Sequence, residues 1–219
     1  RQTGVMLPSS ALLELLMAKM SSPIVATSGN FHGSPIISTN EEAQEKLPKV
    51  ADHFLTHDLH IQFPQDDSIV RCSKENSILI RRSRGLAPNY MTANDDLSKP
   101  VLAMGAHIRS TFTYTTASSM FVSQYFGNLN DFDVFQRYKT TLSDFINIFD
   151  VYPKSILIDK HTNYQSSVLG NELASSWNVE TQEIQHHKAH FASVLGEHDL
   201  FSSNERILGV VWDGKGLGD

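Results

Sequence analysis

The most regular hydrophobic pattern lies in the second half of the chain. Between residues 135 and 149, apolar side chains recur at spacings of three and four, which places them on one face of a helix. They are Phe135, Tyr138, Leu142, Phe145, Ile146 and Phe149. This spacing predicts a long amphipathic helix whose apolar face is buried.

Short apolar runs on both sides of that helix predict the strands of a sheet. We expect strands at 101–105, 111–117, 120–124, 155–159, 181–185 and 206–212. Two further helices are expected, one from Tyr164 to Trp177 and one through residues 186–190. Three strands followed by alternating strands and helices are typical of a mixed α/β fold with helices on the faces of the sheet.

The first part of the chain has a weaker pattern. Leu12, Leu13, Leu16 and Met20 predict a helix that Ser9 or Ser10 can cap. Residues 23–26 predict a short buried strand, followed by the polar loop 27–35. We expect a helix capped by Asn40 and ended by Pro48, with a further helical turn at residues 50–55.

Three more runs in this part, residues 59–63, 68–72 and 77–82, predict an antiparallel meander. The polar stretch 89–100 predicts a linker. We therefore divide the chain into residues 1–92 and residues 93–219.

Composition narrows the class of protein. Hydrophobic residues make up 40% of the 219 and charged residues 19%, as in ordinary globular domains. The net charge of −6 disfavours binding to nucleic acid, which usually needs a basic surface. No apolar run is long enough to cross a membrane and no signal peptide precedes the first helix. Because the chain does not begin with Met and ends in a glycine loop, we interpret it as a fragment.

The chain has one cysteine, Cys72. It can form no internal disulfide and no cysteine-based zinc site, so we expect a reducing, cytoplasmic location. We interpret Cys72 as a packing residue.

Histidines cluster in the segment 183–195. His186 and His190 are four residues apart, so a helix places both rings on one face, close enough to share an ion. Asp213 follows the apolar run 206–212 and can supply an oxygen ligand. His187 points about 100° away on an ideal helix and is left out of the ligand set. The alternative is a pair of histidines on an exposed helix end.

The loop that follows, DGKGLGD, has two interpretations. Its glycine amides can hold a phosphate while Asp213 holds the cation, or its Asp-Gly pair can mark a hairpin turn.

Two other segments carry polar groups suited to a small ligand. Thr27, Ser28 and Asn30 lie in the loop after the first predicted strand, where an ordinary surface loop is the alternative. Arg82 and Arg84 lie on one side of a predicted strand and can clamp a phosphate, although charge also protects edge strands. Arg109 in GAHIRSTF can reach a phosphate, or simply be exposed in a hairpin.

These motifs stand in a familiar order. VATSGNFHGSPI, THDLHIQFPQDDSIVR and ILIRRSRGLAP resemble the YrdC/Sua5-like domain of the HypF-type hydrogenase maturation carbamoyltransferases. VLAMGAHIRSTF, FVSQYFGNLND, LIDKHTNYQSS, IQHHKAHFASVLGEH and LGVVWDGKGLGD resemble that family's Kae1-like domain. The resemblance implies a partial YrdC-like α/β domain followed by one lobe of an actin-like fold.

The resemblance also implies an activity. Family members form carbamoyl adenylate from carbamoyl phosphate and ATP, and transfer the carbamoyl group to the C-terminal cysteine of the partner HypE. That group becomes the cyanide ligand of the [NiFe] hydrogenase iron. A divalent metal is expected in the transfer domain, without a choice among iron, zinc and magnesium. No nucleic acid or membrane partner is expected.

Residues in both predicted domains match the family's functional sites. The adenylate loop matches Thr27, Ser28 and Asn30, and the basic run matches Arg82 and Arg84. The metal ligands match His186, His190 and Asp213, and the phosphate loop matches Gly214, Gly216 and Gly218. We take Asp213 and Arg109 as the candidate catalytic residues.

The chain also departs from the family. The acylphosphatase domain, the zinc fingers, the front of the YrdC-like domain and the second Kae1-like lobe are missing, and Arg109 stands where lysine is usual. We therefore expect these 219 residues alone to be nearly inactive. The alternatives are a Sua5/Kae1-type enzyme of tRNA threonylcarbamoyladenosine synthesis, a non-catalytic nucleotide-binding regulator, and a zinc-dependent hydrolase.

Overall fold

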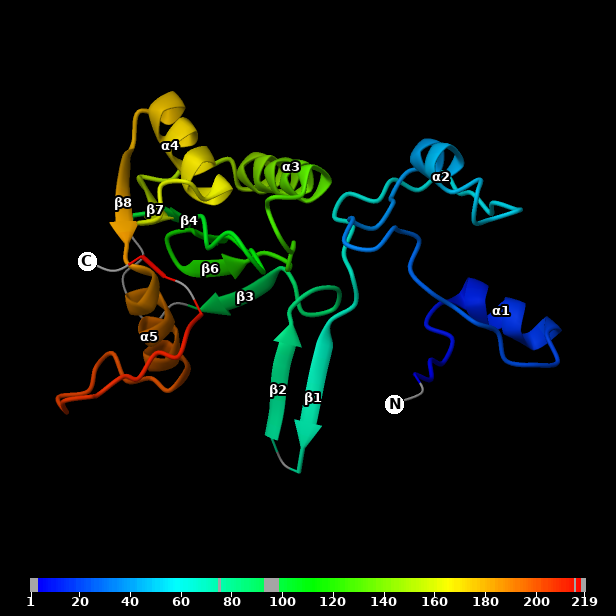
Figure 1. Cartoon of the computed structure of the whole chain (residues 1–219), viewed down its shortest axis with the longest axis horizontal. Coiled ribbons are helices and arrows are strands. Elements are labelled where there is room, and N and C mark those ends of the chain that lie inside the picture. Colours follow the sequence, from blue (N-terminus) through cyan, green and yellow to red (C-terminus); the bar gives the residue numbers. More distant parts are fainter. Residues whose placement is uncertain (1–3, 75, 93–98, 215, 218–219) are drawn as a thin grey trace.

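The computed structural model describes residues 4–74, 76–92, 99–214 and 216–217. Figure 1 shows two differently built parts, with the elements of the sheet gathered on the left and helices α1 and α2 on the right. All buried hydrophobic residues of the described core come from residue 102 onward. The fold is mixed α/β, as the sequence predicts.

A six-stranded sheet is the centre of the second part. The strand order is β3-β6-β5-β4-β7-β8. Neighbours from β3 to β4 are antiparallel, whereas β4, β7 and β8 are parallel. The strands are β3 (Asn89–Thr92), β4 (Val101–Ala103), β5 (Thr113–Thr115), β6 (Ser119–Val122), β7 (Ser155–Asp159) and β8 (Glu180–Ile184). The parallel edge brings the carboxyl ends of β4, β7 and β8 to one place, where ligands bind in open α/β sheets.

Helix α3 (Phe132–Phe149) is the predicted amphipathic helix. Asp131 caps its first turn by accepting hydrogen bonds from Asp133 N and Val134 N. Its apolar face packs against the sheet, and Tyr138 donates its buried hydroxyl to the carbonyl of Met104 at 2.7 Å.

Aromatic rings link α3 to the strands. Phe112 is fully buried and meets Tyr138 and Phe145 edge to face, with ring centres 5.5 and 5.1 Å apart. Such geometry stabilises a core beyond the burial of area alone.

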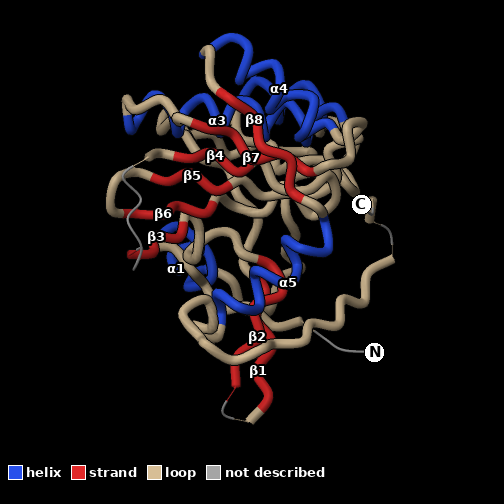
Figure 2. The backbone as a smooth tube through the Cα atoms, turned by 90° about the vertical axis from the view of Figure 1, so that its left-hand side faces the viewer, coloured by secondary structure: helices blue, strands red, loops and turns tan. Residues whose placement is uncertain are grey.

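Helix α4 (Gln165–Trp177) lies on the same side of the sheet as α3 (Figures 1 and 2). Gly170 allows it to approach β7, because a Cβ there would lie 2.5 Å from Ile158 Cγ2. Helix α5 (His186–Glu197) begins just after β8 ends, with Gln185 as its cap. The sequence prediction of these helices and of the strands at 101–103, 113–115, 119–122, 155–159 and 180–184 is confirmed.

The first part has short elements and an exposed surface. Helix α1 (Ala11–Lys19) is capped by Ser10, as predicted, and α2 (Asn40–Lys46) is capped by Thr39, one residue earlier than predicted. Strands β1 (Ile69–Ser73) and β2 (Asn76–Arg81) form an antiparallel hairpin. One tie to the second part is Arg137 of α3, which donates to Ser38 Oγ at 3.3 Å.

Four predictions of local structure are wrong. Residues 23–26, 59–63 and 206–212 are not strands, and residues 50–55 form no helix. The side chain of Val25 is 99% exposed and that of Trp212 is 97% exposed. Within the described chain no strand pairs with these runs, so their backbone groups have no ladder to join.

Residues 89–92 also differ from the prediction. They form β3 in place of the start of a linker, because Tyr90 and its neighbours pair with β6 and the Tyr90 ring contacts Phe121. Residues 93–98, the middle of the predicted linker, lie outside the described residues. The division at 92/93 stays a prediction.

Cys72 is exposed on β1, so its interpretation as a packing residue is wrong. Among the described residues, no helix is long and apolar enough to cross a membrane.

Candidate metal centre

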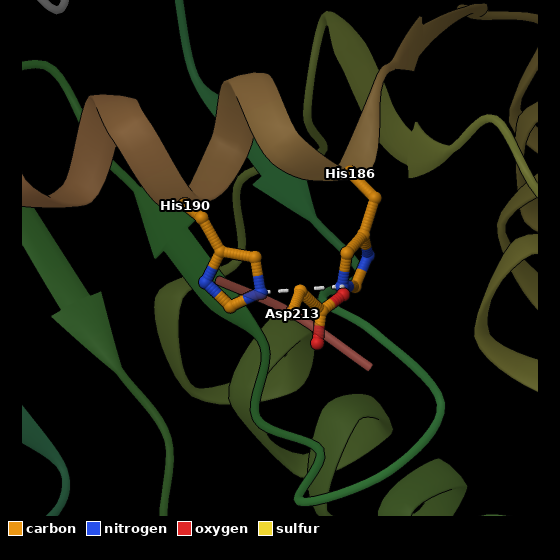
Figure 3. A group of neighbouring side chains, drawn as sticks. All are labelled: His186, His190 and Asp213. Carbon is orange, nitrogen blue, oxygen red and sulfur yellow. Dashed lines mark hydrogen bonds and ion pairs between the residues drawn. The ribbon is translucent and has the colours of Figure 1, made fainter. Parts of the chain in front are cut away.

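Three predicted ligands converge at the start of α5. The ligand atoms of His186, His190 and Asp213 all lie within 4.8 Å of one another. Figure 3 shows both rings pointing from the helix toward the carboxylate. The Nε2 atoms of the two rings are 3.2 Å apart, and Asp213 Oδ2 lies 3.2 Å from Nε2 of His186. The predicted convergence of these groups is present.

These separations suit a shared ion. Ligands bound tetrahedrally at about 2.0–2.1 Å from a metal lie about 3.3 Å from each other. The separations of 3.2 Å from His186 Nε2 to His190 Nε2 and to Asp213 Oδ2 are close to that value. One open position in such a site would leave room for a substrate oxygen.

A buried carboxylate fixes the first histidine. Asp159 ends β7, its side chain is 7% exposed, and its Oδ2 lies 2.7 Å from Nδ1 of His186. Its other oxygen accepts the backbone N–H of His161 at 2.8 Å. Because a carboxylate accepts, Nδ1 of His186 carries the proton and the neutral ring presents its Nε2 lone pair to the cluster.

The protonation pattern gives a physical reason for a cation. The Nε2 lone pair of His186 can accept a hydrogen bond from Nε2 of His190 at 3.2 Å, but it also faces Oδ2 of Asp213 at 3.2 Å, and these two electron-rich atoms would repel one another. A metal ion among them removes that repulsion, and a carboxylate behind a ligating histidine is a usual support of metal sites. The residues present therefore fit a divalent metal.

Asp213 is held in its charged form. The backbone N–H of Gly214 donates to Oδ1 at 2.7 Å, and this bond lowers the pKa of the Asp213 carboxyl. The backbone of Gly216 packs closely against His187, because a Cβ there would lie 2.7 Å from Nε2 of that ring. The loop therefore passes directly over the histidines.

Comparisons with known proteins identify the family of the chain. The model described as "HypF Kae1-like domain" matches residues 96–197, and the Sua5/YciO/YrdC model, described as "Telomere recombination", matches residues 1–83. The carbamoyltransferase HypF of Synechocystis sp. is 36% identical over 99% of this chain. The chain belongs to the HypF family.

Other relatives support the same assignment. A probable carbamoyltransferase HypF of Methanocaldococcus jannaschii is 33% identical over 98% of this chain. A crystal structure of full-length HypF in the phosphate- and nucleotide-bound form superposes with a TM-score of 0.86, at 35% identity over 98% of this chain. HypF of T. kodakarensis superposes at 0.72 over 80% of it.

The chain spans 28% of the length of each of these two curated HypF relatives. It likewise covers 28% of the full-length crystal structure and 23% of the T. kodakarensis chain. The two family models leave residues 84–95 between them, which brackets the predicted division without fixing it.

The other predicted site residues lie apart from the metal cluster. Thr27 and Ser28 are exposed, and the amide of Asn30 donates within its own loop to the carbonyl of Ser34 at 2.7 Å. Figure 1 places this loop, between α1 and α2, on the opposite side of the molecule from α5. These residues would form a separate site.

The arginines of the predicted basic clamp, and their neighbour Arg81, form hydrogen bonds within the chain. Arg84 donates to Oδ1 of Asp67 at 2.6 Å, and Arg81 donates to the backbone carbonyl of Asp67 at 2.8 Å. Arg82 is half-buried, and its carbonyl accepts the N–H of Tyr125. These contacts favour the structural interpretation of the arginine run.

Arg109 and the glycine loop complete the set. Arg109 is exposed in the loop after β4, with a backbone φ of 56°. Gly214 and Gly216 lie beside the cluster, whereas Gly218 lies outside the described residues.

Sequence reasoning missed Asp159. The signal was available, because Asp159 is a charged residue at the end of a buried strand, where ligands gather. It also missed the stack of rings beside the cluster, in which Tyr164 lies between His161, 4.1 Å away, and His107, 5.1 Å away. Burial, followed by Asp159 and Asp213, raises the pKa of Tyr164, which keeps its hydroxyl protonated.

Proposed function

We propose that the parent protein is an ATP-dependent carbamoyltransferase of [NiFe] hydrogenase maturation. Carbamoyl phosphate is first cleaved to carbamate, and carbamate and ATP form carbamoyl adenylate with release of pyrophosphate. The carbamoyl group then passes to the C-terminal cysteine thiol of HypE, and AMP leaves. The convergence of His186, His190 and Asp213 in a chain of the HypF family is the observation that carries this proposal.

The cluster suits the transfer step. A divalent metal, when bound, would supply Lewis-acid stabilisation of the adenylate phosphate as leaving group. His186 and His190 would hold it through neutral rings, and Asp213 would balance its charge. The position of Gly214 leaves room for a phosphate oxygen near the carboxylate, since nothing lies within 4 Å of a Cβ built there.

A cavity beside the cluster suits an unstable intermediate. It measures about 370 Å³ and has a mostly apolar lining at the carboxyl ends of β4, β7 and β8. Its wall includes Ala103, Leu157, Ile184, His186 and His190. Such an apolar wall would disfavour water beside the activated carbamoyl group, which hydrolysis would destroy. The thiol comes from the partner, so this chain needs no catalytic cysteine near the cluster.

The first part would supply the adenylating step. Thr27, Ser28 and Asn30 would contact carbamate and adenylate, and Arg82 and Arg84 the phosphates. Arg109 would approach a phosphate in the second site. Arg84 would have to exchange its contact with Asp67 for the ligand. A reducing cytoplasm, with no nucleic acid or membrane partner, belongs to the same proposal.

The experiment uses the intact parent protein with ATP and two alternative sets of substrates. One mixture contains carbamoyl phosphate and HypE, and the other contains bicarbonate and threonine. The proposal predicts pyrophosphate release and a carbamoyl mass increase on HypE in the first mixture alone. Pyrophosphate release driven by bicarbonate and threonine would instead favour the threonylcarbamoyladenosine pathway.

A further inference from the structure

The second histidine of the segment, His187, has surroundings that differ from those of His186. Its Nδ1 lies 3.0 Å from the side-chain nitrogen of Gln185. Its Nε2 points toward the cluster and lies 3.9 Å from Oδ2 of Asp213, beyond hydrogen-bond distance. The side chain is 37% exposed, and the backbone of Gly216 passes close to its Nε2, since a Cβ there would lie 2.7 Å from that atom.

The orientation of Gln185 is fixed by two backbone groups. Its Oε1 accepts the N–H of Lys188 at 2.8 Å, and its Nε2 donates to the carbonyl of Leu217 at 3.2 Å. A backbone N–H can only donate and a backbone carbonyl can only accept, so exchanging the two ends of the amide would break both bonds. The group facing His187 is therefore the NH₂ donor.

This donor determines the tautomer of His187. Because Nδ1 of His187 accepts from Gln185, the proton of the neutral ring lies on Nε2. His186 has the opposite tautomer, with its proton on Nδ1 and its lone pair toward the cluster. Adjacent histidines thus present a metal-binding lone pair and an N–H donor to the same space.

We propose that His187 binds the substrate as a hydrogen-bond donor, giving its Nε2–H to an anionic phosphate oxygen held beside the metal cluster. Gln185 is the positioning residue that keeps the proton on Nε2. The same amide ties the glycine loop to the start of α5 through Leu217. One side chain therefore orients the donor and anchors the loop that covers it.

The geometry separates this role from metal binding. Nε2 of His187 carries a proton and therefore lacks the lone pair that a metal-coordinating atom needs. No hydrogen-bond acceptor among the described residues takes that proton, which leaves it for a ligand. The inference rests on the proposed function, since the anion is the phosphate of the adenylate.

The test measures binding of AMP and of Mn²⁺ to the intact protein by calorimetry. The portion of AMP binding that disappears in His190→Ala defines the site, so nucleotide bound elsewhere is subtracted. We expect His187→Ala to weaken this portion about tenfold or more, as for loss of a hydrogen bond to a charged group. Mn²⁺ affinity should stay as in the wild type.

Two further variants keep the result interpretable. His187→Gln can place an amide N–H near the position of Nε2 and should recover most of the AMP affinity. Gln185→Glu keeps the acceptor for Lys188 N but loses both donors, so α5 keeps its cap while AMP binding falls as in His187→Ala.

Three results would overturn the inference. They are unchanged AMP binding in His187→Ala, loss of Mn²⁺ in that variant, and a wild type without cluster-dependent AMP binding. Carbamoyl transfer is assayed separately. A wild type that binds AMP as expected but transfers no carbamoyl group would refute the proposed function alone.

Discussion

The two parts of the molecule differ in how far their apolar side chains are buried. In the second part, Phe112, Tyr114 and Ile156 are fully buried between the sheet and two helices. In the first part, Val25 is 99% exposed and Ile80 of the hairpin is 59% exposed. Hydrophobic burial is the main favourable term in folding, so the second part contains the stabilising core of the described chain.

The same contrast holds for carboxylates. Oδ2 of Asp159 lies 2.7 Å from Nδ1 of His186, and the Asp159 side chain is 7% exposed. Oδ1 of Asp67 lies 2.6 Å from a guanidinium nitrogen of Arg84, but the Asp67 side chain is 65% exposed. Solvent and salt screen the second pair, so distance alone does not measure its strength. A short contact has a strong effect only where burial excludes water.

The largest difference should come from removing a core ring. Phe112→Ala is expected to lower the free energy of unfolding by about 3–5 kcal/mol, because it leaves a cavity among packed aromatic rings. Val25→Ala, the matched change in the first part, should alter it by less than about 0.5 kcal/mol. Urea unfolding followed by fluorescence of Trp177 measures both. Equal effects would contradict the contrast between the parts.

The carboxylate pair gives the next largest effect. Asp159→Asn should weaken divalent metal binding about 10- to 100-fold, since it removes the charge that supports His186. Asp67→Asn, its exposed counterpart, should leave metal affinity unchanged. Metal titration followed by calorimetry tests both, and unaltered affinity in Asp159→Asn would remove Asp159 from the site.

A smaller effect concerns alkaline pH. Burial raises the pKa of Tyr138 above its ordinary value. The folded state therefore keeps this proton where the unfolded phenol, with a pKa of about 10, releases it. Stability is full below about pH 10 and falls above it, by about 1.4 kcal/mol per pH unit for this group. Urea unfolding between pH 9 and 11 should show a shallower fall in Tyr138→Phe than in the wild type, and equal slopes would contradict this.

The smallest effect is expected for a charge at the junction of the two parts. Lys46 lies 2.9 Å from Glu42 and 3.8 Å from Asp133 of α3, with 39% of its side chain exposed. Lys46→Ala should change the free energy of unfolding by less than about 0.5 kcal/mol. A loss of several kcal/mol in the same urea assay would mean that the parts depend on this contact.

Most elements of the second part were predicted correctly from the sequence, because their apolar faces pack against other elements of the same part. The spacing from Phe135 to Phe149 matches a face that the sheet covers, so periodicity and burial agree. Residues 23–26 and 206–212 have strand-like composition, but no described strand pairs with them. The pattern of apolar residues in a segment indicates which side chains it can bury. It does not indicate whether a neighbouring strand is available to pair with it.

The candidate metal ligands could be predicted from the sequence, but the residues that hydrogen-bond to the histidines of the site could not. HxxxH spacing and an aspartate at a loop indicated His186, His190 and Asp213, since helical geometry fixes the first pair. Asp159 and Gln185 act through hydrogen bonds whose partners depend on the tertiary structure, such as Asp159 Oδ2 with His186 Nδ1. No spacing rule connects residues 159 and 186.

The central claim is that His186, His190 and Asp213 hold a single divalent ion. Metal content of the intact protein after dialysis, compared with His186→Ala, His190→Ala and Asp213→Ala, tests it most directly. The account predicts that the wild type holds one ion per chain more than each variant, in addition to the zinc expected in the family's upstream fingers. An ion content that is the same in all four proteins would contradict it.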